Sequence, residues 1–134
     1  MGIDRGLIEE TAYGLMKKAA TEIPEDISSA VEHIYSIEKN KLSKTILAHI
    51  LENFEIASSE ARPVCADTGL PRYYVKCGND SSVEGGFVVL EKALRNATAR
   101  ATRDIPLRPN RVHPLTRKDF DNNIGAHAPS ISYS

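Results

Sequence analysis

A short segment rich in proline and glycine, residues 62–78, constrains this chain more than any other feature. It places a thiol, a carboxylate and a hydroxyl, those of Cys65, Asp67 and Thr68, in a stretch whose backbone is expected to be irregular. Residues 73–77 follow with alternating apolar and polar side chains, which predicts a strand. We therefore expect reactive side chains on a loop that a strand holds in place.

Stretches with helical periodicity fill the chain before this segment. Apolar residues recur on one face over residues 3–21, again over 27–37, and again over 42–54. A proline at position 24 ends the first stretch and suits the start of the second. The sequence therefore predicts that residues 1–56 are helical, and amphipathic helices of this kind usually serve packing.

The remainder of the chain contains one more helical pattern between less regular stretches. Residues 83–103 carry apolar side chains at helical spacing, with Phe87, Leu90 and Leu94 expected on the inner face. Prolines recur through the first part of residues 104–125, so this stretch is expected to be an extended loop. Residues 130–134 alternate as a strand does.

These elements predict an α/β (α+β) fold in which N-terminal helices pack on a small sheet. We expect residues 1–134 to form a single partial domain, because the last strand stops before any turn and leaves the sheet truncated before it is complete. Within it, residues 62–78 form an irregular loop and a strand, residues 83–103 a helix, and residues 104–125 a Pro-rich loop.

Composition and charge exclude several classes of function. The chain has 41% hydrophobic and 26% charged residues and a net charge of −1, so it has no bulk attraction to nucleic acid or to an anionic membrane. No apolar run approaches the roughly 18 residues of a membrane span. Two cysteines, Cys65 and Cys77, do not make a disulfide framework, so thiols or metal ligands in a reducing, cytoplasmic setting are expected.

The run Cys65-Ala66-Asp67-Thr68-Gly69 followed by a strand resembles the first cluster-ligand motif of iron–sulfur hydro-lyases. These are the class I fumarate hydratases and the alpha chain of L-tartrate dehydratase. A second stretch, residues 106–125, supports the resemblance through Leu107-Arg108-Pro109-Asn110 and Asp121-Asn122-Asn123-x-Gly125. The similarity runs from about residue 31 to residue 134.

The resemblance implies the reversible addition of water to a small unsaturated dicarboxylic acid, with fumarate and malate the first candidates. It implies that Cys65 is one of three cysteine ligands of a [4Fe–4S] cluster and that Asp67 is a catalytic residue that organises proton transfer. Thr68 and Arg108 are implied to bind substrate, with the planar guanidinium of Arg108 holding a carboxylate. A small dicarboxylate or hydroxy acid, the remaining alpha region, a beta subunit or domain, and further copies of the chain are the implied partners.

The sequence departs from the family pattern in two places. Ala66 stands where many members carry a glutamine that can bond substrate. The family's alpha region is also roughly twice as long, and its other two cluster cysteines lie beyond residue 134. We therefore expect the N-terminal half of an alpha region, which by itself holds no cluster and is inactive. Cys77 is expected to be a buried residue on one face of the strand.

Other interpretations of the same residues stay open. Asp67 can cap its own turn, Arg108 can be a solvated arginine, and His113 can serve packing or contact substrate or a neighbouring subunit. The chain as a whole can be a non-catalytic, truncated remnant that acts as an oligomerising or interaction module. A redox thiol protein is a poor match, because Cys65 has no partner at CxxC spacing.

Overall fold

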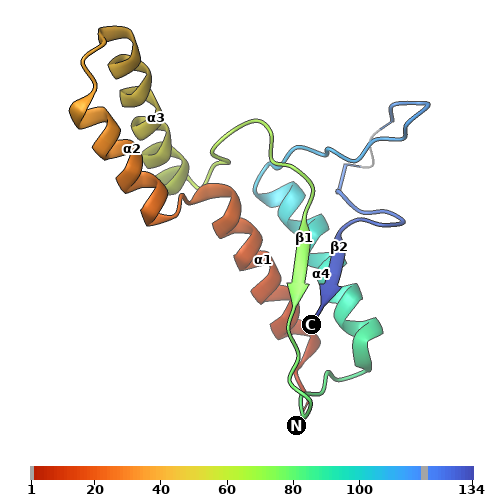
Figure 1. Ribbon diagram of the computed structural model, residues 1–134. Helices are drawn as coiled ribbons and strands as arrows, with labels where there is room; N and C mark the ends of the chain where they lie inside the picture. Colours follow the sequence, from red (N-terminus) through yellow and green to blue (C-terminus); the bar gives the residue numbers. More distant parts are fainter. Residues whose placement is uncertain (1, 119–120) are drawn as a thin grey trace.

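The computed structural model describes residues 2–118 and 121–134, and it shows a mostly helical α/β fold with a small parallel sheet (Figure 1). The fold class expected from the sequence is therefore confirmed. The elements in chain order are α1 (Arg5–Thr21), α2 (Glu25–Ile37), α3 (Lys41–Glu60), β1 (Arg72–Val75), α4 (Gly86–Asp104) and β2 (Ser130–Tyr133).

The core lies where α1 and α4 pack against each other beside the sheet. Ala12 of α1 joins Leu90, Leu94 and Ala97 of α4 in one buried cluster, and the sheet residues Tyr73, Val75 and Ile131 pack against it. Three alanines of α4, at positions 93, 97 and 101, are 0% exposed. Small side chains at these positions let the two helix backbones approach closely, so larger side chains would not fit between the helices.

The two strands are parallel, with Arg72 opposite Ser130 and Val75 opposite Tyr133. A parallel pair needs a long crossover, and here α4 and the loop of residues 105–129 supply it. Beyond the strands, the Ser134 amide donates to the Val75 carbonyl at 3.0 Å. This pairing brings the last residues of the chain beside the segment 62–78, a neighbourhood that periodicity alone does not predict.

Helices α2 and α3 form a hairpin that projects from this body (Figure 1). Pro24 precedes α2, and the Asn40 side chain begins α3 by accepting hydrogen bonds from the amides of Leu42 and Ser43. The hairpin exposes many of its large apolar side chains, namely Ile27, Ile34, Ile37, Leu42, Ile46 and Ile56. Among residues 2–118 and 121–134, no helix is long and apolar enough to cross a membrane.

The ends of α3 and β1 and the exposure of one residue in α4 differ from the sequence prediction. Helix α3 continues to Glu60 rather than ending near residue 56, because Ala57 is buried and the left-handed residue Ala61 ends the helix. Strand β1 ends at Val75, so Cys77 lies beyond it and is only half-buried, which corrects its assignment as a buried strand residue. Phe87, expected on the inner face of α4, is 55% exposed, because it lies in the first turn of a helix that begins at Gly86.

Candidate functional site

The first loop of the candidate site is attached to the ends of two helices. The amide of Val64 donates to the carbonyl of Ala20 in α1 at 3.0 Å, and the carbonyl of Val64 accepts from Asn53 Nδ2 of α3 at 2.8 Å. The amide of Arg62 also donates to the carbonyl of Ala57. Cys65 therefore directly follows Val64, a residue whose amide and carbonyl are both hydrogen-bonded to helices.

Direct hydrogen bonds join the first loop to the Pro-rich loop. Thr68 Oγ1 accepts from the amide of Arg108 at 3.0 Å, and Asn110 Nδ2 donates to the carbonyl of Gly69 at 2.9 Å. Gly69 has a φ of 67°, a backbone conformation that glycine adopts without strain. The two stretches that carry the motif resemblance are thus brought together, although about 40 residues separate them in the sequence.

Asn123 ties the Pro-rich loop to α4 from the inside. Its side chain is buried: Oδ1 accepts from the amide of Asn110 at 2.9 Å, and Nδ2 donates to the carbonyl of Arg108 at 3.0 Å and to Thr102 Oγ1 at 3.2 Å. The backbone of Arg108 is consequently held at both its N–H and its C=O. Sequence reasoning quoted Asn123 in a motif but assigned it no role, since its burial depends on contacts made far along the chain.

Two arginines near the motif loops hold backbone carbonyls. Arg95 Nη1 donates to the carbonyls of Gly125 and Ala128, and Arg111 Nη1 donates to the carbonyl of Ile124 at 2.9 Å. The guanidinium of Arg111 occupies the space where a Cβ on residue 125 would stand, which explains a glycine there. Some of the arginines in this region therefore stabilise the loops by bonding to backbone carbonyls.

An open hollow of about 620 Å³ lies where the first loop meets the Pro-rich loop. It contains three of the four predicted site residues, Cys65, Thr68 and Arg108, while Asp67 is not among the lining residues. Its charged residues are Arg62, which forms an ion pair with Glu60 at 3.0 Å, and Arg108, so the hollow favours an anion such as a carboxylate mainly through Arg108. The lining residues are Asn53, Arg62, Pro63, Val64, Cys65, Ala66, Thr68, Pro106 and Arg108. Sequence reasoning missed Asn53 because it lies on a helix without any motif.

The predicted site residues differ in how they are held. Arg108 has a fixed backbone and an exposed side chain. Cys65 is also exposed, and its Sγ donates to the carbonyl of Asp67 at 3.2 Å, which folds this part of the loop into a tight bend. Asp67 is exposed, and it is not among the residues that line the hollow. His113 serves its own turn, where Nδ1 accepts from the amides of residues 115 and 116.

The thiol of Cys65 fits one ligand position of a metal cluster but not a complete site. Within the described parts of the chain, no three His, Cys, Asp or Glu residues stand close enough together to hold a metal ion. Both cysteines are free, and Cys77 lies past the opposite end of β1. The residues present therefore do not fit a whole [4Fe–4S] cluster. Positions 119 and 120 of the predicted substrate loop lie outside the described residues.

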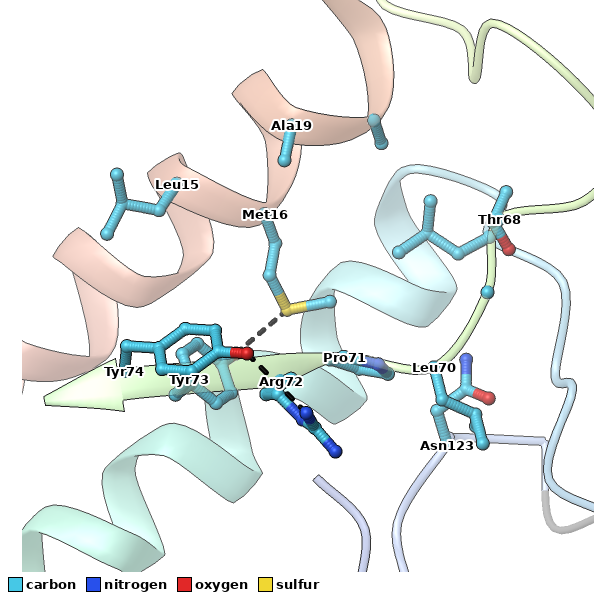
Figure 2. Close-up of a pocket in the computed structure, with 13 residues that line it drawn as sticks. Leu15, Met16, Ala19, Thr68, Leu70, Pro71, Arg72, Tyr73, Tyr74 and Asn123 are labelled. Atoms are coloured by element: carbon cyan, nitrogen blue, oxygen red, sulfur yellow. Dashed lines mark hydrogen bonds between the residues drawn. The ribbon is translucent and has the colours of Figure 1, made fainter. Parts of the chain in front are cut away.

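A second hollow, of about 510 Å³, opens on the other side of Thr68, between α1 and β1 (Figure 2). Its walls are mainly apolar, and the hydroxyl of Tyr73 at its base donates to Met16 Sδ at 2.9 Å and lies 3.0 Å from Thr98 Oγ1. Burial raises the pKa of Tyr73 above its ordinary value, although the hydrogen bond with Thr98 acts in the opposite direction. Among the described residues that line this hollow Arg72 alone is charged, whereas the hollow at Cys65 has two arginines beside the motif cysteine, so the hollow at Cys65 is the better candidate for acid substrates.

Comparison with known proteins gives a consistent result. Residues 9–134 match the sequence model of the family described as Fumarate hydratase (Fumerase). The chain is 37% identical over 125 residues to a Methanocaldococcus jannaschii protein named "Putative L(+)-tartrate dehydratase subunit alpha", covering 93% of this chain and 44% of that one. It is 30% identical over 125 residues to a Geobacillus stearothermophilus protein named "Putative fumarate hydratase class I", covering 92% and 24%.

A third relative, the L(+)-tartrate dehydratase subunit alpha of Escherichia coli K12, is 27% identical over 114 residues, covering 85% of this chain and 37% of that one. The chain therefore spans less than half the length of each of these three relatives.

Proposed function

The chain belongs to the fumarate hydratase family, and from that premise we propose that it supplies the first substrate-contacting loops of a hydro-lyase. Such an enzyme adds water to, or removes it from, a carbon–carbon bond of a small dicarboxylic or hydroxy acid. The observation that carries the proposal is the bond between Thr68 and Arg108, which joins the two motif loops around one cationic hollow. Fumarate and L(+)-tartrate are the acids in the relatives' names, and fumarate is proposed first.

Arg108 is proposed to bind and orient a substrate carboxylate. Its backbone is bonded at both the N–H and the C=O, and the residue lines the hollow, so the guanidinium is attached to a fixed point in the wall. A planar guanidinium makes two parallel hydrogen bonds to a carboxylate, which sets the orientation of the acid as well as its position. Thr68 accepts from the amide of Arg108, and its own hydroxyl hydrogen remains available to a substrate oxygen.

Asp67 is proposed to organise proton transfer at the substrate carbon. Hydration of a double bond requires a group that gives or removes a carbon-bound proton, and the carboxylate of Asp67 is the acidic side chain in the first motif loop. Asp67 is exposed and does not line the hollow, although both neighbours in the sequence, Ala66 and Thr68, do. The proposal therefore requires the carboxylate to turn toward a bound acid.

Cys65 is proposed as one of three cysteine ligands of a [4Fe–4S] cluster in the complete enzyme. The other two ligands come from polypeptide outside this chain, so the chain alone is expected to bind no cluster and to be inactive. The remaining alpha region and a beta subunit are the proposed partners, in keeping with the designation "subunit alpha" of two relatives. Free thiols suit a reducing compartment, and we place the protein in the cytoplasm.

The test combines the chain with the missing parts. The full chain is produced anaerobically with the part of the Methanocaldococcus jannaschii alpha subunit outside the match and with its companion subunit. Turnover of fumarate and L(+)-tartrate is then measured together with iron content. We expect both iron and turnover in the assembly, loss of both with Cys65→Ser, and retention of both with the control Cys77→Ser. Full iron and full turnover in Cys65→Ser would show that the first motif is misassigned.

The same experiment separates the alternative function, a non-catalytic interaction module. The feature that favours this alternative is the incomplete ligand set within the described residues. An assembly that forms stably but holds no iron and turns over neither acid would support the module and contradict the hydro-lyase.

A further inference from the structure

We propose that the free edge of β1, with the apolar groove between β1 and α1, is a docking site for an extended polypeptide segment. In that segment apolar residues alternate with acidic ones. Its source is the part of the longer alpha region that lies outside the matched stretch. The proposal uses family membership and the groove itself, and it does not depend on the hydro-lyase activity.

The backbone of β1 is half paired. The bonds from the Ser130 amide to the Pro71 carbonyl and from the Ser134 amide to the Val75 carbonyl show that odd-numbered residues of β1 face β2. In a parallel ladder the intervening residues direct their N–H and C=O groups to the opposite edge. Arg72 and Tyr74 therefore present donors and acceptors to a neighbour on the side away from β2. An edge of this kind is a template for an added strand.

The side chains around this edge form an apolar groove. A hollow of about 360 Å³ lies between the N-terminal part of α1 and strand β1. It shares Leu15, Tyr73 and Tyr74 with the hollow of about 510 Å³ shown in Figure 2. On the α1 wall Leu7 is 62% exposed and Leu15 is 59% exposed, and on the strand Tyr74 is 76% exposed. An added strand would cover these side chains as well as bond the edge.

The charges of the groove specify the occupant. Among the described residues that line the two hollows, the only charged side chains are Arg72 and Lys76, and both residues are exposed. They flank Tyr74 on the same face of the strand, because side chains alternate. Antiparallel pairing with a second copy about Tyr74 would place Arg72 opposite Lys76, and like charges directly opposite are destabilising. Carboxylates on a foreign strand are favourable at the same two places.

The family comparison indicates where such a strand comes from. More than half of the Methanocaldococcus jannaschii relative lies outside its match to this chain. A sheet of two strands is marginal, and a third strand on β1 would place β1 at the centre of a three-stranded sheet.

Overlapping 15-residue peptides, fluorescently labelled and spanning the unmatched part of that relative, provide the probe. Binding to the full chain is measured by fluorescence anisotropy. We expect the bound peptides to share alternating apolar and acidic residues. The double variant Arg72→Glu/Lys76→Glu should bind them at least about tenfold more weakly, because two attractive contacts become repulsive. The control Lys39→Glu/Lys41→Glu makes the same change in net charge just before α3 and at its first residue, and it should bind as the parent does.

The backbone contribution is tested separately. Tyr74→Pro removes an outward N–H that takes no part in the ladder with β2, so it should abolish binding, whereas Tyr74→Thr should retain most of it. Circular dichroism checks that each variant is folded, and the charge-reversal pair remains decisive if Tyr74→Pro is not. The proposal is overturned if no peptide binds or if the bound peptides lack alternating apolar and acidic residues. It is also overturned if the affinity is unchanged in Arg72→Glu/Lys76→Glu or in a folded Tyr74→Pro. Self-association through this edge in place of peptide binding would also overturn it.

Discussion

At the scale of single residues, the candidate site depends on a few polar side chains that bond mainly to backbone groups. Thr68 and Asn123 hold the N–H and the C=O of Arg108, and Asn110 links the same loop to Gly69. The exposed groups, Cys65 and the Arg108 guanidinium, are left available for chemistry. Rigid support beneath exposed functional groups is the usual requirement for precise orientation.

In the assembled enzyme, Arg108→Lys is expected to keep the iron and lose activity. Lysine preserves the positive charge but not the two parallel hydrogen bonds that orient a carboxylate. We expect kcat/KM to fall about 100-fold, equivalent to about 2.7 kcal/mol at the barrier. The matched control is Arg5→Lys at the start of α1, where the guanidinium forms a surface ion pair with Glu9 at 3.9 Å. If Arg108→Lys is as active as the parent, the proposed carboxylate-binding role of the Pro-rich loop is contradicted.

Asn123→Ala is expected to destabilise the fold by about 3 kcal/mol. The change leaves the Asn110 amide and the Arg108 carbonyl without their partner, and alanine tolerates the left-handed φ of 56° less well than asparagine. Urea denaturation measures the free energy of unfolding. The control Asn79→Ala, on an exposed turn, should stay within about 0.5 kcal/mol of the parent, and equal losses in both variants would contradict the buried network.

At the scale of elements, α4 organises the body because it contacts every other part of it. Ala97 of this helix packs against α1. The hydroxyls of Thr98 and Thr102 hydrogen-bond to the side chains of Tyr73 and Asn123. The side chain of Arg95 donates to backbone carbonyls in the loop before β2. The helix therefore links the core to the candidate site, and changes on its inner face are expected to affect both.

Ala97→Leu should destabilise the protein by about 1–3 kcal/mol. The side chain of Ala97 is 0% exposed where α1 and α4 meet, so added methylenes force the helices apart. The control is Ala30→Leu on the exposed surface of α2, expected within about 0.5 kcal/mol of the parent. Thermal or urea unfolding followed by circular dichroism distinguishes the two, and a neutral Ala97→Leu would mean that the interface can expand freely.

Strand β2 is linked to α4 by a tyrosine whose titration is shifted. Burial raises the pKa of Tyr133 to about 12, and its hydrogen bond to Glu91 and the nearby Glu91 charge add to the effect. A tyrosine in the unfolded chain titrates near 10, so the folded state holds this proton more tightly. The stabilisation is fully present below about pH 10 and is lost as pH rises through about 12.

Ultraviolet absorbance of the phenolate measures this titration. The variant Glu91→Gln removes the negative charge and should lower the pKa of Tyr133 toward its ordinary value, although burial keeps it raised. A titration curve that is unaffected by Glu91→Gln would contradict a contribution from that carboxylate.

At the scale of the whole molecule, the chain combines a packed body with a projecting hairpin (Figure 1). The body contains the sheet, and the hollow at Cys65 lies where the body meets α3 through Asn53, whereas the hairpin exposes large apolar side chains that include Leu42 at 71% and Ile46 at 51%. Apolar surface gathered on one element is typical of a protein–protein interface, so the hairpin is our proposed site of homo-oligomer formation.

Light scattering should therefore find a dimer or larger assembly in solution. Leu42 and Ile46 are one helical turn apart, so Leu42→Lys/Ile46→Lys places two charges on the same face and should shift the chain toward monomer. The control Leu115→Lys changes an isolated residue that is 87% exposed in the Pro-rich loop and should leave the mass unchanged. A clean monomer of the parent chain at high concentration would contradict the proposal.

The sequence by itself determined the order and type of the elements. Helical periodicity, Pro24 and the alternation at residues 73–77 and 130–134 predicted four helices and two strands because these signals are local. The motif around Cys65 and the stretch around Arg108 also predicted the family, which the comparisons confirm. The boundaries of α3 and β1 were wrong by a few residues, since burial of Ala57 and pairing with β2 determine them.

Only the tertiary structure decided which of these residues meet. Thr68 and Arg108 are 40 positions apart, and they are neighbours because Asn123 and α4 hold the second loop against the first. The free edge of β1 is likewise invisible in a list of strands, because it depends on the parallel register with β2. Hydrogen bonds and packing between distant segments depend on the complete arrangement of the chain, whereas periodicity and turn composition act within a few residues.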